Sequence, residues 1–90
     1  MEQFSALRLF ISVADTGSFS AAAELLDLST SVVSRGIAAL EAELGIRLLK
    51  RSTRRVALTE AGSLYLVRVR SLLTELEDTN RSLKQPNTPA

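Results

Sequence analysis

Residues 28–45 read LSTSVVSRGIAALEAELG, and the two halves of this stretch follow different rules. Apolar residues recur at spacings of four, three and four, which predicts one buried face of an α-helix: Val33, Ile37, Leu40 and Leu44. Ser29 is placed to cap this helix and Gly45 to end it. The first two turns, however, gather hydroxyl groups, valines and Gly36, all of which lower helix stability. These residues therefore need a role other than helix stability.

Two further helices are predicted before residue 28. Residues 3–15 carry apolar side chains at spacings of three and four, with Phe10 beside them: Phe4, Leu7, Ile11 and Ala14. The turn DTGSFS at residues 15–20 supplies capping side chains, so a short second helix is expected to begin near residues 18–20. Asp27 and Leu28 break this helix just before Ser29, so the second and third helices form a tight corner.

After Gly45 the apolar pattern loses its helical period. Two apolar segments, residues 46–49 and 56–58, flank a polar centre and predict a small β-hairpin. Thr59 then caps a final helix over about residues 60–83, with Glu60 opposing the positive end of the helix dipole.

The final helix carries a heptad-like apolar seam and is too long for so small a domain to cover. Its distal residues are therefore expected to pair with a second copy, in an antiparallel arrangement that places opposite charges across from each other. The residues assigned to dimerisation are Val69, Leu72, Leu73, Leu76 and Leu83, although packing within one chain is an alternative for Val69. The chain thus divides into three parts. Residues 1–59 form a domain of three helices and the hairpin, residues 60–84 a linker or dimerisation helix, and residues 85–90 a flexible tail or the start of a hinge.

The net charge of +1 hides an asymmetry along the chain. Residues 1–34 have a net charge of −3, residues 35–70 of +5 and residues 71–90 of −1. A basic block between neutral or acidic segments is expected of a site for a polyanion, although a solvated basic face is a common alternative.

The absence of cysteine and histidine removes most catalytic and metal-binding chemistry. Glu41 and Glu43 lie two residues apart on a predicted helix and so point to different sides. We therefore expect neither an enzyme nor a cofactor. No apolar run approaches the roughly 20 residues that span a bilayer, and no export signal is visible, so no membrane contact and a cytoplasmic location are expected.

The polar side of the helix that follows Ser29 gathers at its amino end as Thr30, Ser31, Ser34 and Arg35. In a DNA-binding helix-turn-helix, the second helix of the corner lies in the major groove with its N-terminal residues against base edges. This arrangement predicts duplex DNA as the partner. A winged-helix module that binds protein instead is the alternative, and it explains the basic residues of the hairpin less well.

Several short motifs, in a fixed order, resemble the N-terminal domain of LysR-type transcriptional regulators. They are Ala22-Ala23, Leu26, Leu28-Ser29, Val33-Ser34-Arg35, Ile37, Leu40-Glu41, Leu44-Gly45, RLLKR and RRVALTEAG, and the match extends from residue 3 to about residue 83. The resemblance implies a mainly α winged helix-turn-helix of three helices and a β-hairpin wing, followed by a long linker helix. It further implies a homodimer on a pseudo-palindromic DNA site, with a tetramer left open for a full-length parent, and an effector-binding domain that this chain lacks.

Carried over residue by residue, the resemblance assigns the major-groove surface to Thr30, Ser31, Val32, Ser34 and Arg35. Ser18 and Ser20 would meet phosphate, while Arg54 at the wing would reach the minor groove with Arg55 beside it. Three positions depart from the family pattern. Thr30-Ser31 stands where Gln-Pro is frequent, Gly36 where a long polar side chain is frequent, and Asp27 where the turn often has glycine.

Overall fold

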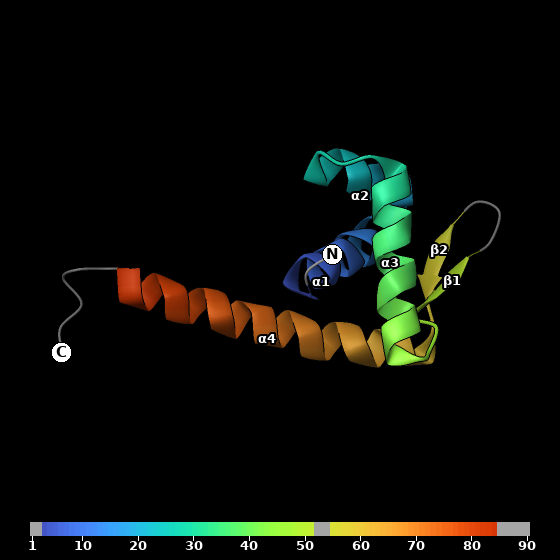
Figure 1. The fold of residues 1–90 in the computed structure, drawn as a ribbon. Helices are drawn as coiled ribbons and strands as arrows, with labels where there is room; N and C mark the ends of the chain where they lie inside the picture. The colour runs from blue at the N-terminus through green and yellow to red at the C-terminus, as the bar shows by residue number, and fades with distance from the viewer. Residues whose placement is uncertain (1–2, 52–54, 85–90) are drawn as a thin grey trace.

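The computed structural model describes residues 3–51 and 55–84 of the 90-residue chain. Within these ranges the elements are α1 (Gln3–Thr16), α2 (Phe19–Leu26), α3 (Thr30–Leu44), β1 (Leu49–Arg51), β2 (Val56–Leu58) and α4 (Glu60–Lys84). Figure 1 shows the first three helices and the hairpin grouped at one end, with α4 extending away from them. The molecule is therefore elongated, with extents of 53 × 27 × 20 Å. This architecture confirms the predicted winged helix-turn-helix with a long fourth helix; the expected tail at 85–90 lies outside the described residues.

The predicted starts of α2, α3 and α4 are confirmed by side-chain caps. The hydroxyl of Ser18 accepts a hydrogen bond from the N–H of Ala21, and that of Ser29 accepts one from Val32, both at 3.1 Å. Thr59 caps α4 in the same way, accepting from the N–H of Gly62 at 2.9 Å. Each cap satisfies a backbone donor that the first helical turn leaves without a partner.

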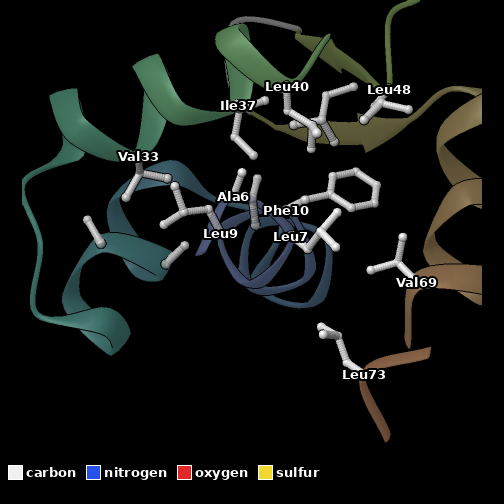
Figure 2. Close-up of a cluster of buried hydrophobic side chains, with 14 residues drawn as sticks. Ala6, Leu7, Leu9, Phe10, Val33, Ile37, Leu40, Leu48, Val69 and Leu73 are labelled. Carbon is white, nitrogen blue, oxygen red and sulfur yellow. The ribbon is translucent and has the colours of Figure 1, made fainter. Parts of the chain in front are cut away.

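The hydrophobic core surrounds α1, as Figure 2 shows. Phe10 and Val13 of α1 are fully buried against Val33 and Ile37 of α3. The sequence predicted Phe4, Leu7 and Ile11 on the inward side of α1; Leu7 is buried and Ile11 packs against the core, but Phe4 is 52% exposed. The prediction was wrong for Phe4 because the contacts of α1 with α2, α3, α4 and β2 bury residues from Ala6 onward, beyond the first turn of the helix.

The hairpin is a two-stranded antiparallel sheet in which Leu49 pairs with Leu58 and Arg51 with Val56. The first strand was predicted over residues 46–49, but β1 begins only at Leu49. Residues 46–48 instead connect α3 to the strand, and Ile46 in this connection is 50% exposed. The apolar pattern marked this segment, but Ile46 bonds back to α3 instead of pairing in the sheet, its N–H donating to the carbonyl oxygen of Glu41 at 3.2 Å.

The proximal half of α4 belongs to the same core, because Val69 and Leu73 are only 3% and 6% exposed. Two ion pairs add links between α1 and α4: Arg70 with Asp15 at 2.7 Å and Arg8 with Glu77 at 3.8 Å. The side chain of Leu83, near the far end of α4, is 81% exposed. None of the helices in the described part of the chain combines the length and hydrophobicity that a membrane crossing requires.

Candidate nucleic-acid interface

The amino end of α3 presents its polar side chains outward. Thr30, Ser31 and Arg35 are exposed and Val32 and Ser34 are half-buried. The opposite side of the helix is packed into the core by its apolar residues: Val33, Ile37 and Leu40. A rigidly anchored helix thus displays hydroxyl groups and one guanidinium at its exposed end.

Arg35 lies along its own helix, with Nε donating to the carbonyl oxygen of Ser31 at 3.4 Å. This hydrogen bond is long and exposed, so the guanidinium can exchange it for an external acceptor at small cost. Gly36 behaves differently from its neighbours, because it is buried on the inner side of α3. Glycine at position 36, where the family often has a long polar side chain, therefore does not remove a group from the exposed polar face of α3.

The corner between α2 and α3 depends on Asp27. This residue has φ 58° and ψ 47°, which is the left-handed region that non-glycine residues seldom enter and that Asp tolerates comparatively well. The N–H of Asp27 donates to the carbonyl oxygen of Glu24 at 3.2 Å, and that of Leu28 donates to Ala23 at 2.8 Å. These bonds end α2 and set the direction in which α3 leaves the corner.

The start of α2 carries the two serines predicted to meet phosphate. The Oγ atom of half-buried Ser18 is occupied by its cap on Ala21 and lies 3.0 Å from the Oγ atom of Ser20. Ser20 is exposed. Its hydroxyl is thus the more available of the two for an external acceptor.

Of the two arginines predicted for the wing, the structure describes one. Arg55 is exposed beside β2, whereas Arg54 lies outside the described residues. An open groove separates the outer side of α3 from the hairpin and the start of α4, and its lining includes Ala38, Ala42, Arg47 and Arg51. The sequence analysis assigned no contact to Arg47 or Arg51, because their distance from α3 depends on how the chain folds back after Gly45.

Two pKa values of the described residues shift, and both belong to the framework rather than to α3. Burial raises the pKa of the Tyr65 phenol, and the negative charge of Glu43 raises it further. The hydrogen bond and charge of Asp15 raise the pKa of Arg70. Tyr65 packs against Phe10 with ring centroids 5.7 Å apart, so this pair connects α4 to the centre of the core.

The residues predicted for dimerisation separate into two groups. Leu72, Leu76 and Leu83 are 62%, 39% and 81% exposed, whereas Val69 and Leu73 are buried in the core of their own chain. Val69 therefore packs within its own chain, as the alternative held, and the assignment of Leu73 to dimerisation was wrong because Leu73 is also buried in that core.

The sequence analysis missed an apolar groove between the end of α3 and α4, whose exposed residues are Leu44, Ile46, Leu64 and Leu72. Leu44 was predicted to face the core, yet it is 42% exposed at the last turn of α3.

Comparisons with known proteins agree with this geometry. The chain is 51% identical over 83 residues to an HTH-type transcriptional regulator of Azotobacter vinelandii, covering 92% of this chain and 58% of that protein. It is 42% identical over 90 residues to the HTH-type transcriptional activator AaeR of Escherichia coli K12, covering 99% of this chain and 29% of AaeR. The chain thus spans less than two thirds of the length of these relatives.

A solved structure described as the complex of BenM_DBD with catB site 1 DNA has the same fold. It superposes with a TM-score of 0.90 at 33% sequence identity and covers both chains completely. The sequence pattern of the family described as bacterial regulatory helix-turn-helix protein, lysR family, matches residues 4–63. That match extends over α1, α2, α3, the hairpin and the start of α4, so the chain belongs to the lysR family of bacterial regulatory helix-turn-helix proteins.

Proposed function

We propose that this chain binds double-stranded DNA sequence-specifically, as the DNA-reading part of a transcriptional regulator. The observation that carries the proposal is the exposed polar amino end of α3, a helix whose opposite side is anchored in the core by Val33, Ile37 and Leu40. The relatives named as transcriptional regulators and the DNA complex of BenM_DBD support it. The same comparisons favour a binding function over catalysis, and a regulator that acts on bacterial DNA works in the cytoplasm.

In this proposal α3 enters the major groove with its first two turns against the base edges. Arg35 provides the fork of donors that pairs with guanine, and the hydroxyl groups of Ser31 and Ser34 permit close approach. Thr30 and Val32 complete this surface, Val32 through contact with a thymine methyl group.

The flanking contacts go to the DNA backbone and the minor groove. Ser20, with Ser18 behind it, presents the start of α2 to a phosphate, and backbone amides at a helix start favour such an anion. Arg54 and Arg55 are assigned to the wing, where a narrow A·T-rich minor groove attracts arginine.

A homodimer follows from the exposed apolar side of α4. Burying a fully exposed leucine contributes about 1.5–3 kcal/mol, so covering the exposed parts of Leu72, Leu76 and Leu83 with a second copy would contribute part of that amount for each, and together they support association. Residues 60–84 then act as the linker and dimerisation helix in an antiparallel pair, with a tetramer left open for a longer parent protein. Two subunits related by two-fold symmetry place two copies of α3 on a pseudo-palindromic site.

Selection from a pool of random duplexes tests this function. The chain should enrich one motif with two-fold symmetry, and binding to that motif should weaken steeply with salt because phosphate contacts release counterions. The alternative, a winged-helix module that binds protein, predicts no enriched motif and only weak association with any duplex. That outcome would contradict the proposal.

A further inference from the structure

Arg51 and Phe19 form a contact between the hairpin and the helix-turn-helix. Arg51 is the last residue of β1 and Phe19 is the first residue of α2. The Cζ atom of Arg51 lies 4.9 Å from the centroid of the Phe19 ring. A guanidinium over an aromatic face at this distance is held by attraction to the electron-rich ring.

Both partners of this contact are held by the surrounding fold. Phe19 is half-buried and packs against the hydrophobic core. Arg51 pairs with Val56 in the sheet, and the N–H of Val56 faces the carbonyl oxygen of Gly17 at 3.4 Å. The hairpin therefore meets the turn before α2 at the place where the ring lies, so the position of the guanidinium is defined by two elements.

The location of Arg51 relates it to the two parts of the proposed DNA surface. Its neighbour across the contact, Phe19, lies between Ser18 and Ser20 in the chain. Arg51 also lines the groove beside Ala38, which is one helical turn beyond Ser34 on α3. A DNA strand that passes from α3 toward the start of α2 would run beside Arg51.

The bonding of Arg51 suits an external anion. Among residues 3–51 and 55–84, Arg8, Arg70 and Arg81 form ion pairs with carboxylates, and Arg51 forms none. Stacking uses the flat face of a guanidinium and leaves the N–H groups at its edge to form hydrogen bonds. A phosphate oxygen accepts such charge-assisted bonds in a two-pronged geometry.

We propose that Arg51 binds a backbone phosphate of duplex DNA and that Phe19 is a positioning residue, whose ring holds the guanidinium at that phosphate. The inference rests on the proposed function and deepens it, because it adds a phosphate contact at Arg51, a residue to which the sequence analysis assigned no contact. It also gives the half-buried aromatic residue at the start of α2 a role in binding that is separate from its role in packing.

The test is a salt series with the full chain, on a labelled duplex of random sequence of about 25 base pairs and on the duplex selected from the pool. Arg51→Ala should reduce the slope of log K against log salt by about 0.9 for each subunit bound, because one phosphate contact is lost. Arg81→Ala is the matched control: it removes one positive charge on the far half of α4 and should leave the slope unchanged.

Phe19 is tested by a double-mutant cycle. Phe19→Leu should weaken binding to both duplexes, whereas Phe19→Tyr, which keeps the ring, should bind like the parent. In the Arg51→Ala background Phe19→Leu should have no further effect, since the group that the ring positions is absent. Circular dichroism and thermal melting of each variant separate a loss of fold from a loss of contact, and if Phe19→Leu unfolds, a Phe19→Tyr variant that binds as weakly as Arg51→Ala still overturns the role of the ring.

The outcomes are distinguishable. If the parent binds with a steep salt dependence and Arg51→Ala retains the same slope, the phosphate contact is overturned and the proposed function stands. If Phe19→Leu weakens binding equally with and without Arg51, or if Phe19→Tyr binds as weakly as Arg51→Ala, the positioning role of Phe19 is overturned. A parent that binds neither duplex overturns the proposed function, and the inference with it.

Discussion

The carboxylate of Glu41 accepts a hydrogen bond from the backbone N–H of Leu48 at 2.7 Å, and a second N–H, that of Leu49, reaches the same oxygen at 3.1 Å. Glu41 is 8% exposed on the last half of α3. The charged side chain thus satisfies two backbone donors where the chain enters β1, and it fixes the hairpin relative to the helix proposed to read DNA.

Replacing Glu41 with Ala should destabilise the chain by about 2–3 kcal/mol, because two buried N–H groups lose a charged acceptor. Glu41→Gln keeps an acceptor oxygen and should lose less. Urea unfolding followed by circular dichroism measures both. Glu43→Ala, at an exposed position on the same helix, is the control and should change stability by less than about 0.5 kcal/mol. Equal stability of Glu41→Ala and Glu43→Ala would contradict the role of this carboxylate.

Gly62 permits the start of α4 to approach the segment before β1. A Cβ atom at this position would lie 2.0 Å from the carbonyl oxygen of Leu48. Because that atom is backbone and cannot rotate away, Gly62→Ala should destabilise the fold by at least about 2 kcal/mol despite the better helix propensity of alanine. Thermal unfolding beside Ser63→Ala, an exposed neighbour, checks this. A Gly62→Ala variant as stable as the parent would show that α4 can shift without cost.

How far these features follow from the sequence depends on the range of the interactions that create them. The starts of α2, α3 and α4 were predictable because Ser18, Ser29 and Thr59 cap donors only three residues ahead of them. The family resemblance pointed to the turn at Asp27 as a position where glycine is frequent, and the structure gives Asp27 a positive φ there. Hydrogen bonds between residues so close in the sequence can be predicted from the local residue types alone.

The remaining features required the tertiary structure. The burial of Leu73 depends on α4 lying against α1, and the contact of Arg51 with Phe19 depends on the hairpin returning to the start of α2. Ile46 is a residue type that is frequent in strands but lies outside the sheet, so its exposure could not be inferred from the pattern.

The polar face of α3, in contrast, was predictable, because periodicity alone separates Ser31 and Arg35 from Val33 and Ile37.

The raised pKa of Tyr65 predicts a pH dependence of stability. Its ordinary value is 10.0, and burial with the nearby charge of Glu43 raises the pKa in the folded chain. The folded state then holds the phenol proton more tightly than the unfolded state, so the contribution is present below about pH 10 and is lost as the pH rises through the folded value. Subtracting the urea midpoints of Tyr65→Phe from those of the parent between about pH 9 and 11 isolates this group. A difference that stays constant with pH, or that grows in favour of the parent at alkaline pH, would contradict the assignment.

The exposed leucines of α4 predict a dimer at about 10 µM, which Leu72→Glu/Leu76→Glu should convert to a folded monomer. Analytical ultracentrifugation measures the mass in each case. Val69→Ala is the contrasting change: it should lower thermal stability, because Val69 is buried in its own chain, without placing a charge on the dimer surface. A parent that already sediments as a monomer would end the dimer proposal.

The most direct test of sequence-specific binding by α3 is the affinity of Arg35→Ala, Arg81→Ala and the parent for the selected duplex and for a random one. Arg35→Ala should lose about 1–3 kcal/mol of binding to the selected duplex, roughly fivefold to 150-fold, and much less on the random duplex, because a base contact contributes chiefly at its own site. Arg81→Ala should match the parent on both duplexes. If Arg35→Ala binds the selected duplex as tightly as Arg81→Ala and the parent do, α3 does not read DNA through this residue and the central claim is wrong.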